Sequence, residues 1–390
     1  MILVLVALLL IAAPPLFFAY AYAGYPLLLW LLSHRRPRLT PPGDPAVWPL
    51  LTITVPSYNE EGRIRATLEN LLAVDYPPER RQILVVSDAS TDRTDAIVAE
   101  FADRGVDLLR LSERRGKTAA ENAAGRVLRG EIVVNTDATI RILPQSLKAL
   151  VRAFQDPTVG VASGRDVSAG AEAIEGNQGE SGYVGYEMWV RSLETRLGGI
   201  VGASGCFYAF RREIHDTNFP DALSRDFACA MIAREHGFRA VSVDAAVCIV
   251  PRAASLHSEF RRKIRTMSRG IETLWYKRHL MNPVRYGGFA MMLLSHKLAR
   301  WLFYLALPWA VVGLLLLTTT SRAAVIALVV LALGCLLGAL GMRWPAGRRV
   351  PLLVAVPGFA LASNLAGVLA WLKVLRREQS VHWEPTRRPA

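Results

Sequence analysis

Apolar residues are concentrated at the two ends of the chain, whereas its middle alternates between short apolar runs and helical patterns. Residues 2–32 are almost wholly apolar, and three further apolar segments cover 301–317, 323–341 and 350–372. Segments of this length are candidates for membrane-spanning helices. Between residues 50 and 250 the pattern changes to β-branched runs separated by stretches with helical spacing. The chain therefore predicts an α/β domain between an N-terminal and a C-terminal membrane region.

The N-terminal segment, residues 1–33, carries its positive charge after the apolar stretch, in His34-Arg-Arg-Pro-Arg38. A cleaved signal peptide carries that charge before its apolar core, so we expect an uncleaved anchor. Its N-terminus should lie outside and the chain after residue 33 inside, and Pro14-Pro15 should kink it. The proline-rich stretch 34–49 then predicts a linker.

An amphipathic element precedes the C-terminal membrane region. In residues 255–282 basic positions surround an apolar stripe at helical spacing. The stripe consists of Leu256, Phe260, Ile264, Met267, Ile271 and Leu274. We expect this helix to lie in the cytoplasmic interface of the membrane. The alternative is a solvated basic helix packed on the α/β domain.

Residues 283–375 predict the C-terminal membrane region, and 376–390 form a basic tail. Three spans in this region would place the tail outside, whereas its positive charge favours the inside. Either the last segment, broken by Pro351 and Pro357, is re-entrant or interfacial, or the charge rule fails at this end.

Four apolar runs in the domain, residues 50–254, predict strands that alternate with helices. The runs cover 50–55, 82–86, 106–111 and 131–136, and helical patterns begin near 64, 94 and 117. This βαβα order predicts a doubly wound, mostly parallel sheet. Further along, 144–154 predicts a helix, 159–163 a strand, and the glycine-rich stretch 169–185 a mobile loop.

Polar side chains follow three of these strands. Run 50–55 leads into Pro56-Ser-Tyr-Asn-Glu-Glu61, run 82–86 into Ser87-Asp88, and run 131–136 into Asp137. The carboxyl ends of parallel strands meet at one edge of a sheet, where ligands of α/β proteins bind. Acidic residues converging there predict a metal and phosphate site.

The composition narrows the functional classes. Net charge is +13 although 52% of the residues are hydrophobic. Nucleic-acid binding would explain the charge but not the apolar ends, whereas a membrane protein with Lys and Arg facing anionic lipid explains both. We therefore expect membrane lipid as a partner and no nucleic acid. The four cysteines show no metal-ligand spacing, so reduced thiols are expected.

Six motifs resemble, in order and spacing, those of family 2 glycosyltransferases, which include cellulose, chitin and hyaluronan synthases and many single-transfer bacterial enzymes. The motifs are PSYNEE (56–61), VVSDASTDRT (85–94), RRGKTAAENAA (114–124), NTDAT (135–139), GASGCFYAFRRE (202–213) and SRDF (224–227). The resemblance covers residues 50–275. It implies the GT-A fold and a nucleotide diphosphate sugar as donor, in the first place a UDP-sugar.

The resemblance also implies roles for residues on the donor side. Asp137 matches the acidic motif that binds Mg²⁺ or Mn²⁺, and Thr139 stands where a second Asp is expected. Lys117 begins a helix, so its ammonium and that helix terminus can both face phosphate. The positions implied to contact the nucleotide are Tyr58, Asn59, Glu61 and Asp88. Taken alone, Asp88 and Asp137 could instead cap structural elements, and Lys117 could be a solvated surface lysine.

On the acceptor side, Asp226 matches the general base of the family, and Arg225 replaces the acid that usually precedes it. A guanidinium beside Asp226 would favour the ionised carboxylate and lower its basicity. Gly202, Ser204 and Gly205 match the acceptor-side loop, in which glycines let the backbone approach the sugar closely. Without the motif order, Asp226 could be a helix N-cap.

Processive members of the family carry a Gln-x-x-Arg-Trp motif on the helix after the base. The corresponding stretch, Arg262-Lys-Ile-Arg-Thr-Met267, keeps Arg265 but has Thr266 in place of the tryptophan. The aromatic surface that helps to hold a growing chain is thereby lost, although Trp275 further along could substitute. We therefore expect one sugar to be added per acceptor.

The leading hypothesis is an inverting, metal-assisted glycosyltransferase in the cytoplasmic (inner) membrane, multi-pass, with its catalytic domain facing the cytoplasm. The acceptor would be a membrane-proximal or lipid-linked saccharide. One alternative is a processive polysaccharide synthase. The other, motivated by Thr139 and Arg225, is a catalytically silent scaffold of a polysaccharide export complex.

Overall fold

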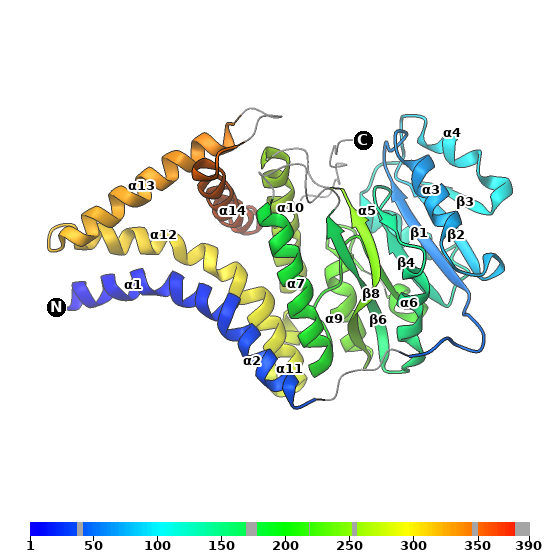
Figure 1. Ribbon diagram of the computed structural model, residues 1–390, viewed down its shortest axis with the longest axis horizontal. Helices are drawn as coiled ribbons and strands as arrows, with labels where there is room; N and C mark the ends of the chain where they lie inside the picture. The colour runs from blue at the N-terminus through cyan, green and yellow to red at the C-terminus, as the bar shows by residue number, and fades with distance from the viewer. Residues whose placement is uncertain (37–41, 169–177, 218, 252–255, 345–349, 379–390) are drawn as a thin grey trace.

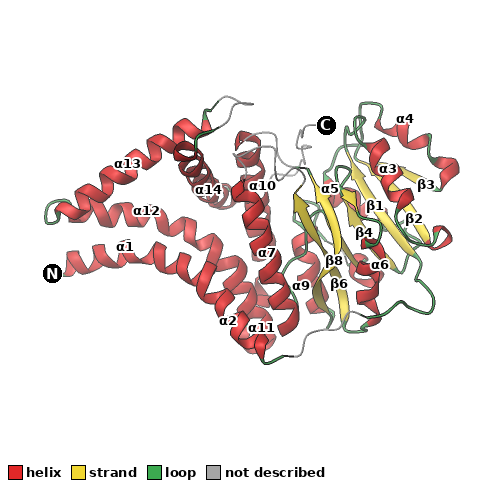
Figure 2. Cartoon of the chain, in the orientation of Figure 1, coloured by secondary structure: helices red, strands yellow, loops and turns green. Residues whose placement is uncertain are grey.

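An eight-stranded sheet covered by helices stands beside a group of long apolar helices (Figure 1). The computed structural model describes residues 1–36, 42–168, 178–217, 219–251, 256–344 and 350–378. Helices α7 (Gln178–Leu197) and α10 (Leu256–Tyr276) lie between the sheet and the apolar helices (Figure 2). The predicted arrangement of an α/β domain with candidate membrane helices at both ends of the chain is confirmed.

The sheet is parallel in its first half and mixed in its second. The strands are β1 (Leu51–Ser57), β2 (Arg81–Ser87), β3 (Val106–Arg110), β4 (Ile132–Thr136), β5 (Arg141–Ile142), β6 (Val159–Ser168), β7 (Phe207–Arg211) and β8 (Arg239–Val250). Their order is β3-β2-β1-β4-β7-β6-β8-β5. Four of the seven pairings are parallel, and β7 runs antiparallel to both of its neighbours, β4 and β6. The doubly wound prediction therefore holds for β1 to β4.

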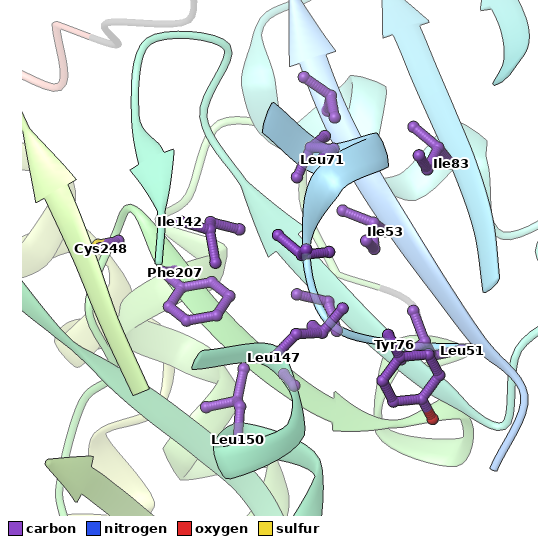
Figure 3. Packing of buried hydrophobic residues seen from close by; sticks show 14 of the residues in the cluster. Leu51, Ile53, Leu71, Tyr76, Ile83, Ile142, Leu147, Leu150, Phe207 and Cys248 are labelled. Atoms are coloured by element: carbon purple, nitrogen blue, oxygen red, sulfur yellow. The ribbon is translucent and has the colours of Figure 1, made fainter. Parts of the chain in front are cut away.

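Helices cover both faces of the sheet because the strands are buried on both sides. The helices of the domain, besides α7, are α3 (Ile64–Ala73), α4 (Thr94–Ala99), α5 (Lys117–Ala124), α6 (Ser146–Arg152), α8 (Arg212–His215) and α9 (Arg225–Glu235). On one face Leu71 of α3 and Leu147 of α6 pack in the same core as Ile53 of β1 (Figure 3). On the other face α5 and α9 pack in a second core with Tyr208 of β7. The parallel strands are thus held rigidly, and their carboxyl ends have fixed positions.

Two predictions within the domain need correction. The stretch 178–185 belongs to helix α7 and not to a loop, while 169–177 lies outside the described residues. Packing overrides the glycines there, because Val190 and Leu193 of α7 form a buried cluster with Tyr25 and Leu29. Strand β6 continues to Ser168 because it pairs with β8, a strand that the sequence pattern did not predict.

Among the described residues, four helices are long and apolar enough to cross a membrane. They are Ile2–His34, Pro283–Leu317, Arg322–Met342 (α13) and Leu352–Leu375 (α14). The first comprises α1 (Ile2–Ala19), a π-helical turn (Tyr20–Gly24) and α2 (Tyr25–His34); the second comprises α11 (Pro283–Leu293), a π-helical turn (Leu294–Leu298) and α12 (Ala299–Leu317). Helix α1 continues through both prolines at 14 and 15, and the helix changes to π-helical geometry at Tyr20–Gly24. The kink at the prolines stays a prediction.

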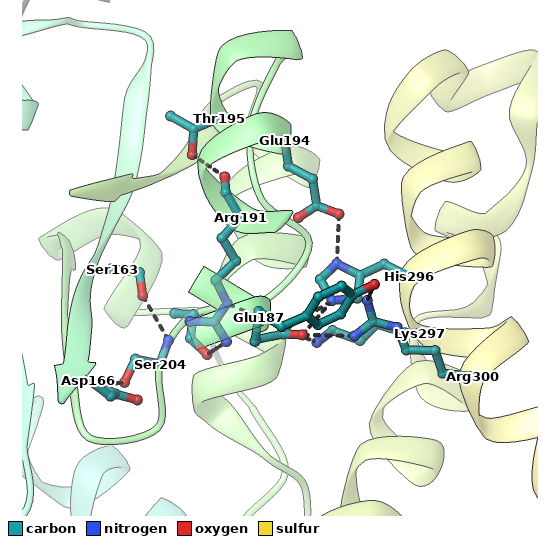
Figure 4. Close-up of polar contacts among 12 residues, drawn as sticks. Ser163, Asp166, Glu187, Arg191, Glu194, Thr195, Ser204, His296, Lys297 and Arg300 are labelled. Atoms are coloured by element: carbon teal, nitrogen blue, oxygen red, sulfur yellow. Dashed lines mark hydrogen bonds and ion pairs between the residues drawn. The ribbon is translucent and has the colours of Figure 1, made fainter. Parts of the chain in front are cut away.

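The second of these helices begins earlier than the predicted start at residue 301. The polar side chains before residue 301 interrupt the apolar pattern, but the protein buries them. His296 forms ion-pair contacts with Glu187 (2.9 Å) and Glu194 (2.7 Å) of α7. Arg300 pairs with the same Glu187 at 2.8 Å (Figure 4). Tyr25 of α2 donates a 2.5 Å hydrogen bond to Glu194. These residues form a polar cluster that joins the domain to the apolar helices.

Helix α10 is confirmed as a helix, and it contacts both parts of the molecule. Ile271 and Leu274 of its apolar stripe are buried, and α10 packs along α14. The ammonium of Lys263 donates to the hydroxyl of Ser363 on α14, at 2.9 Å. Its position in the membrane interface stays a prediction. All four cysteines are free, and their reduced state stays a prediction.

Candidate functional site

The carboxyl ends of β1, β2 and β4 meet at one edge of the sheet, because β1 lies between the other two strands. The backbone N–H of Asp88, after β2, donates to the carbonyl of Ser57 at the end of β1 (2.8 Å). Asp137 directly follows β4. The structure therefore brings the three predicted strand ends together.

Asp88 shapes the loop that leads into α5. Its carboxylate is buried and accepts hydrogen bonds from the backbone N–H groups of Arg115 and Gly116, both at 2.7 Å. Gly116 has a φ of +96°, which a residue with a side chain rarely adopts. This loop places Lys117 at the start of α5. The nucleotide contact of Asp88 stays a prediction.

The loop after β1 is fastened to the loop after β2. Asn59 and Glu61 accept backbone hydrogen bonds from the β2–α4 loop, at 2.8 and 3.1 Å. The guanidinium of Arg114 lies 3.9 Å from the ring centroid of Tyr58. A partly exposed aromatic ring beside a cation suits a planar base that carries phosphates, which agrees with the predicted role of this edge.

Lys117 lies at the centre of the site. Its ammonium is 2.5 Å from Oδ1 of Asp137, 2.8 Å from the carbonyl oxygen of Gly205 and 4.0 Å from Glu121. Burial alone would lower the pKa of Lys117, but the nearby carboxylates of Asp137, Glu121 and Asp226 outweigh burial and raise it. The site therefore contains a permanent positive charge at the tip of β4.

Glu121 is a buried acid that the sequence did not single out, because it lies within an alanine-rich helix. Burial raises the pKa of Glu121 to about 7, against the opposing charges of Lys117 and Arg225. Its carboxylate lies 3.5 Å from the hydroxyl of Tyr208. Glu121 thus lies 4.0 Å from the ammonium of Lys117, and it changes its protonation state near neutral pH.

Asp226 lies in the first turn of α9, against the predicted acceptor-side loop. The hydroxyl of Ser224 donates to Oδ1 of Asp226 at 2.6 Å. A Cβ atom on Gly205 would lie only 2.7 Å from Oδ2, so the carboxylate touches this glycine. Because Lys117 contacts the carbonyl of the same Gly205, the groups Asp137, Lys117 and Asp226 form one continuous cluster.

The neighbour Arg225 points elsewhere. Its guanidinium donates to the side chain of Asn122 and to the carbonyl of His215, and it lies over the ring of Phe210. Among the residues that the structure describes, Arg225 forms no ion pair with Asp226. Arg225, which replaces the usual acid of the motif, therefore binds residues that pack against α9. The expected lowering of the basicity of Asp226 by a direct contact with Arg225 has no such contact behind it.

In the acceptor-side loop, Ser204 is turned inward. It is buried, its hydroxyl donates to Asp166 at 2.6 Å, and its N–H donates to the hydroxyl of Ser163 at 2.8 Å (Figure 4). A Cβ atom on Gly202 would lie 2.8 Å from the ring of Phe227. These residues hold the loop in place; contact between loop and acceptor stays a prediction.

The residues at the tip of β4 fit a divalent cation that is shared with a substrate. Among the described residues no group of three or more His, Cys, Asp or Glu side chains could hold a metal ion. Asp137 offers one carboxylate, and Thr139, two positions on, is partly exposed. Mg²⁺ in phosphate-binding sites takes one or two carboxylates and completes its shell with phosphate oxygens and water.

Arg265, the basic residue predicted on the acceptor side, lies on α10 and is partly buried. Its contact with an acceptor stays a prediction.

Comparison with known proteins agrees with this geometry. Residues 52–219 match the family model described as Glycosyl transferase family 2. A beta-monoglucosyldiacylglycerol synthase of Nostoc sp. is 30% identical over 174 residues, which are 43% of this chain and 37% of the relative. A poly-beta-1,6-N-acetyl-D-glucosamine synthase of Staphylococcus aureus is 24% identical over 229 residues, 57% of this chain and 55% of the relative. The chain thus spans about half, or less, of the length of these relatives.

One solved structure is similar along almost the whole chain. The mannosyltransferase PcManGT from Pyrobaculum calidifontis, in complex with GDP-Man and Mn²⁺, is 25% identical and superposes with a TM-score of 0.73. The similarity covers 97% of this chain and 100% of that structure. It therefore includes the apolar helices as well as the domain.

Gly205→Ala tests the contact between the acceptor-side loop and Asp226. The added Cβ atom would meet Oδ2 at 2.7 Å and push the carboxylate aside. We expect turnover to fall about tenfold or more, because small displacements of reacting groups are costly. Nucleotide-sugar affinity and the unfolding temperature should change little. Gly185→Ala, where an added Cβ meets no atom within 4 Å, is the matched control. Wild-type turnover of Gly205→Ala would contradict the contact.

Glu121→Gln tests the buried acid. The folded protein keeps the Glu121 proton up to a pKa of about 7, whereas the unfolded chain releases it near 4.5. The free energy of unfolding of the wild type should therefore fall by up to about 3 kcal/mol as pH rises from 4.5 to 7. Glutamine does not titrate, so the free energy of unfolding of the variant should rise relative to that of the wild type between pH 4.5 and pH 8. Glu100→Gln, on the surface, is the control. A pH-independent difference would refute the burial effect.

Proposed function

Because this chain contains a family 2 glycosyltransferase domain, we propose that it transfers one sugar from a nucleotide diphosphate sugar to a membrane-proximal or lipid-linked saccharide. The observation that carries the proposal is the cluster around Gly205, in which Lys117 and Asp137 adjoin Asp226. It offers a positive charge for a departing diphosphate and a carboxylate for an acceptor proton. Both are needed for glycosyl transfer.

In this mechanism the acceptor hydroxyl gives its proton to Asp226 while its oxygen bonds to the anomeric carbon. The bond from that carbon to the phosphate oxygen breaks, and the electron pair leaves with the diphosphate. A single displacement of this kind inverts the configuration. The ammonium of Lys117 stabilises the leaving charge. Asp137, with Thr139 beside it, would hold Mg²⁺ or Mn²⁺, which supplies further positive charge to the phosphates.

The donor is a GDP-sugar or a UDP-sugar. The motifs favour a UDP-sugar, whereas the structure of PcManGT, similar over the whole chain, contains GDP-Man. The base would lie near Tyr58, Asn59 and Glu61, and Asp88 would support the loop beneath the diphosphate. GDP-mannose is therefore the first donor to test, beside the UDP-sugars.

The four apolar helices support a multi-pass protein of the cytoplasmic membrane, with the catalytic domain in the cytoplasm where nucleotide sugars are made. Single transfer is supported by α10, because Thr266 is exposed where processive members have tryptophan. The intact cluster of Asp137, Lys117 and Asp226 argues against a silent scaffold.

The proposal is tested by incubating the purified chain with GDP-mannose and a panel of UDP-sugars and measuring nucleotide release in the presence of membrane lipid extract. Asp226→Asn should abolish release while nucleotide-sugar binding persists, because an amide keeps the shape but cannot accept the proton. Asp216→Asn, on the surface at the end of α8, is the control. If Asp226→Asn keeps most of the wild-type turnover, Asp226 is not the base.

Asp137→Ala should lower activity far more than Thr139→Ala, because a carboxylate binds a hard cation better than a hydroxyl does. Thr139→Asp should be tolerated and should tighten Mn²⁺ binding, measured by titration of the protein with nucleotide present. Full activity of the wild type in excess chelator would show that no divalent ion is needed.

A further inference from the structure

The segment that leads into Asp226 is held by α10, the helix that packs on α14. The backbone N–H of Ser224 donates to the hydroxyl oxygen of Thr273 on α10, at 2.9 Å. The hydroxyl of Thr273 in turn donates to the carbonyl of Arg269 one turn earlier, at 2.7 Å. Thr273 is fully buried. Its hydroxyl therefore has two fixed partners and a fixed orientation.

Ser224 occupies the N-cap position of α9 but does not act as a cap. A serine at this position usually accepts a hydrogen bond from a backbone N–H of the first turn, which stabilises the helix. In the described part of the chain the Ser224 hydroxyl makes no such bond, and instead donates to Oδ1 of Asp226 at 2.6 Å. The stabilisation available from capping is thus given up for a contact with the carboxylate.

The other side of the same peptide is also tied to α10. The carbonyl of Leu223 accepts hydrogen bonds from the guanidinium of Arg269 (2.6 Å) and from the hydroxyl of Thr118 (2.8 Å). The peptide between Leu223 and Ser224 is therefore bound at its oxygen by Arg269 and at its N–H by Thr273. Two residues one turn apart on α10 fix the plane of this peptide, and with it the origin of the Ser224 side chain.

We propose that Thr273 is a positioning residue, which acts through Ser224 to orient the carboxylate of Asp226 toward the acceptor. The inference rests on the proposed role of Asp226 as the base. The chain of contacts runs from Thr273 through the N–H of Ser224 to its hydroxyl, and from there to Oδ1. On the other side Oδ2 faces Gly205, where an added Cβ atom would lie 2.7 Å away. One carboxylate oxygen is thus hydrogen-bonded, and the other lies close to the acceptor-side loop.

Thr273→Val tests the proposal, because valine has the same shape and lacks the acceptor oxygen. We expect kcat to fall about tenfold, while the KM for the donor and its affinity stay unchanged. Thr273→Ser keeps the oxygen and should restore most of the turnover. A role limited to packing would not be rescued in this way.

The chain offers a matched control in Thr195 of α7. Its hydroxyl donates to the carbonyl of Arg191 one turn earlier (2.8 Å) and accepts the backbone N–H of Ser242 (2.9 Å), the same pattern as in Thr273. Thr195→Val removes equivalent bonds but leaves the peptide before α9 and the contact between Ser224 and Asp226 intact, so it should keep its turnover. An equal loss of kcat in Thr195→Val and Thr273→Val would overturn the proposal.

Ser224→Ala removes the direct contact with Asp226 and provides a second variant if Thr273→Val does not fold; it should lower kcat in the same manner. Wild-type kcat in a folded Thr273→Val, or in Ser224→Ala, overturns the inference while Asp226→Asn is inactive. Retained turnover in Asp226→Asn would instead refute the proposed function. The two failures are therefore distinguishable.

Discussion

The largely buried ammonium group of Lys117 needs partners of opposite charge, and the arrangement of the site follows from this requirement. An unpaired charge in a protein interior costs several kcal/mol, so Lys117 is stable only where carboxylates and carbonyls converge on it. The partners come from three elements: Asp137 at the end of β4, Gly205 in the loop before β7, and Glu121 one turn along α5. Once these meet, Asp226 is brought against Gly205.

A second cluster, at the junction with the apolar helices, also pairs buried charges with groups of opposite charge. Glu187 of α7 contacts Arg191, His296, Lys297 and Arg300. The cations outweigh the effect of burial and hold the pKa of Glu187 well below its usual value. Breaking such a buried pair costs about 3–5 kcal/mol, since it leaves a charge without compensation. Domain and apolar helices are therefore joined by charge as well as by packing.

The sequence is informative where one periodic pattern determines the outcome. The runs that form β1, β2 and β4 are rich in Ile, Leu and Val, so their strands and polar ends could be predicted, and six motifs indicated the family whose model residues 52–219 match. The sequence is uninformative where the structure or role of a residue depends on a partner that is distant in the chain. Residues 294–300 look too polar for an apolar helix until α7 supplies Glu187 and Glu194. Glu121 and Ser224 lie within motifs but were not singled out there, and Thr273 lies in no motif, because each acquires its role from a contact across the fold.

Helix α10 shows why two interpretations of an amphipathic helix need not exclude each other. An interfacial position and a place on the domain were alternatives, yet Lys263 bonds α14 while Arg269 and Thr273 bond the peptide before α9. The carboxylate of Asp226 is thereby linked through α10 to the apolar helices. For an acceptor confined to the membrane, that arrangement removes freedom of approach before the reaction begins, which is how fixed geometry lowers a barrier.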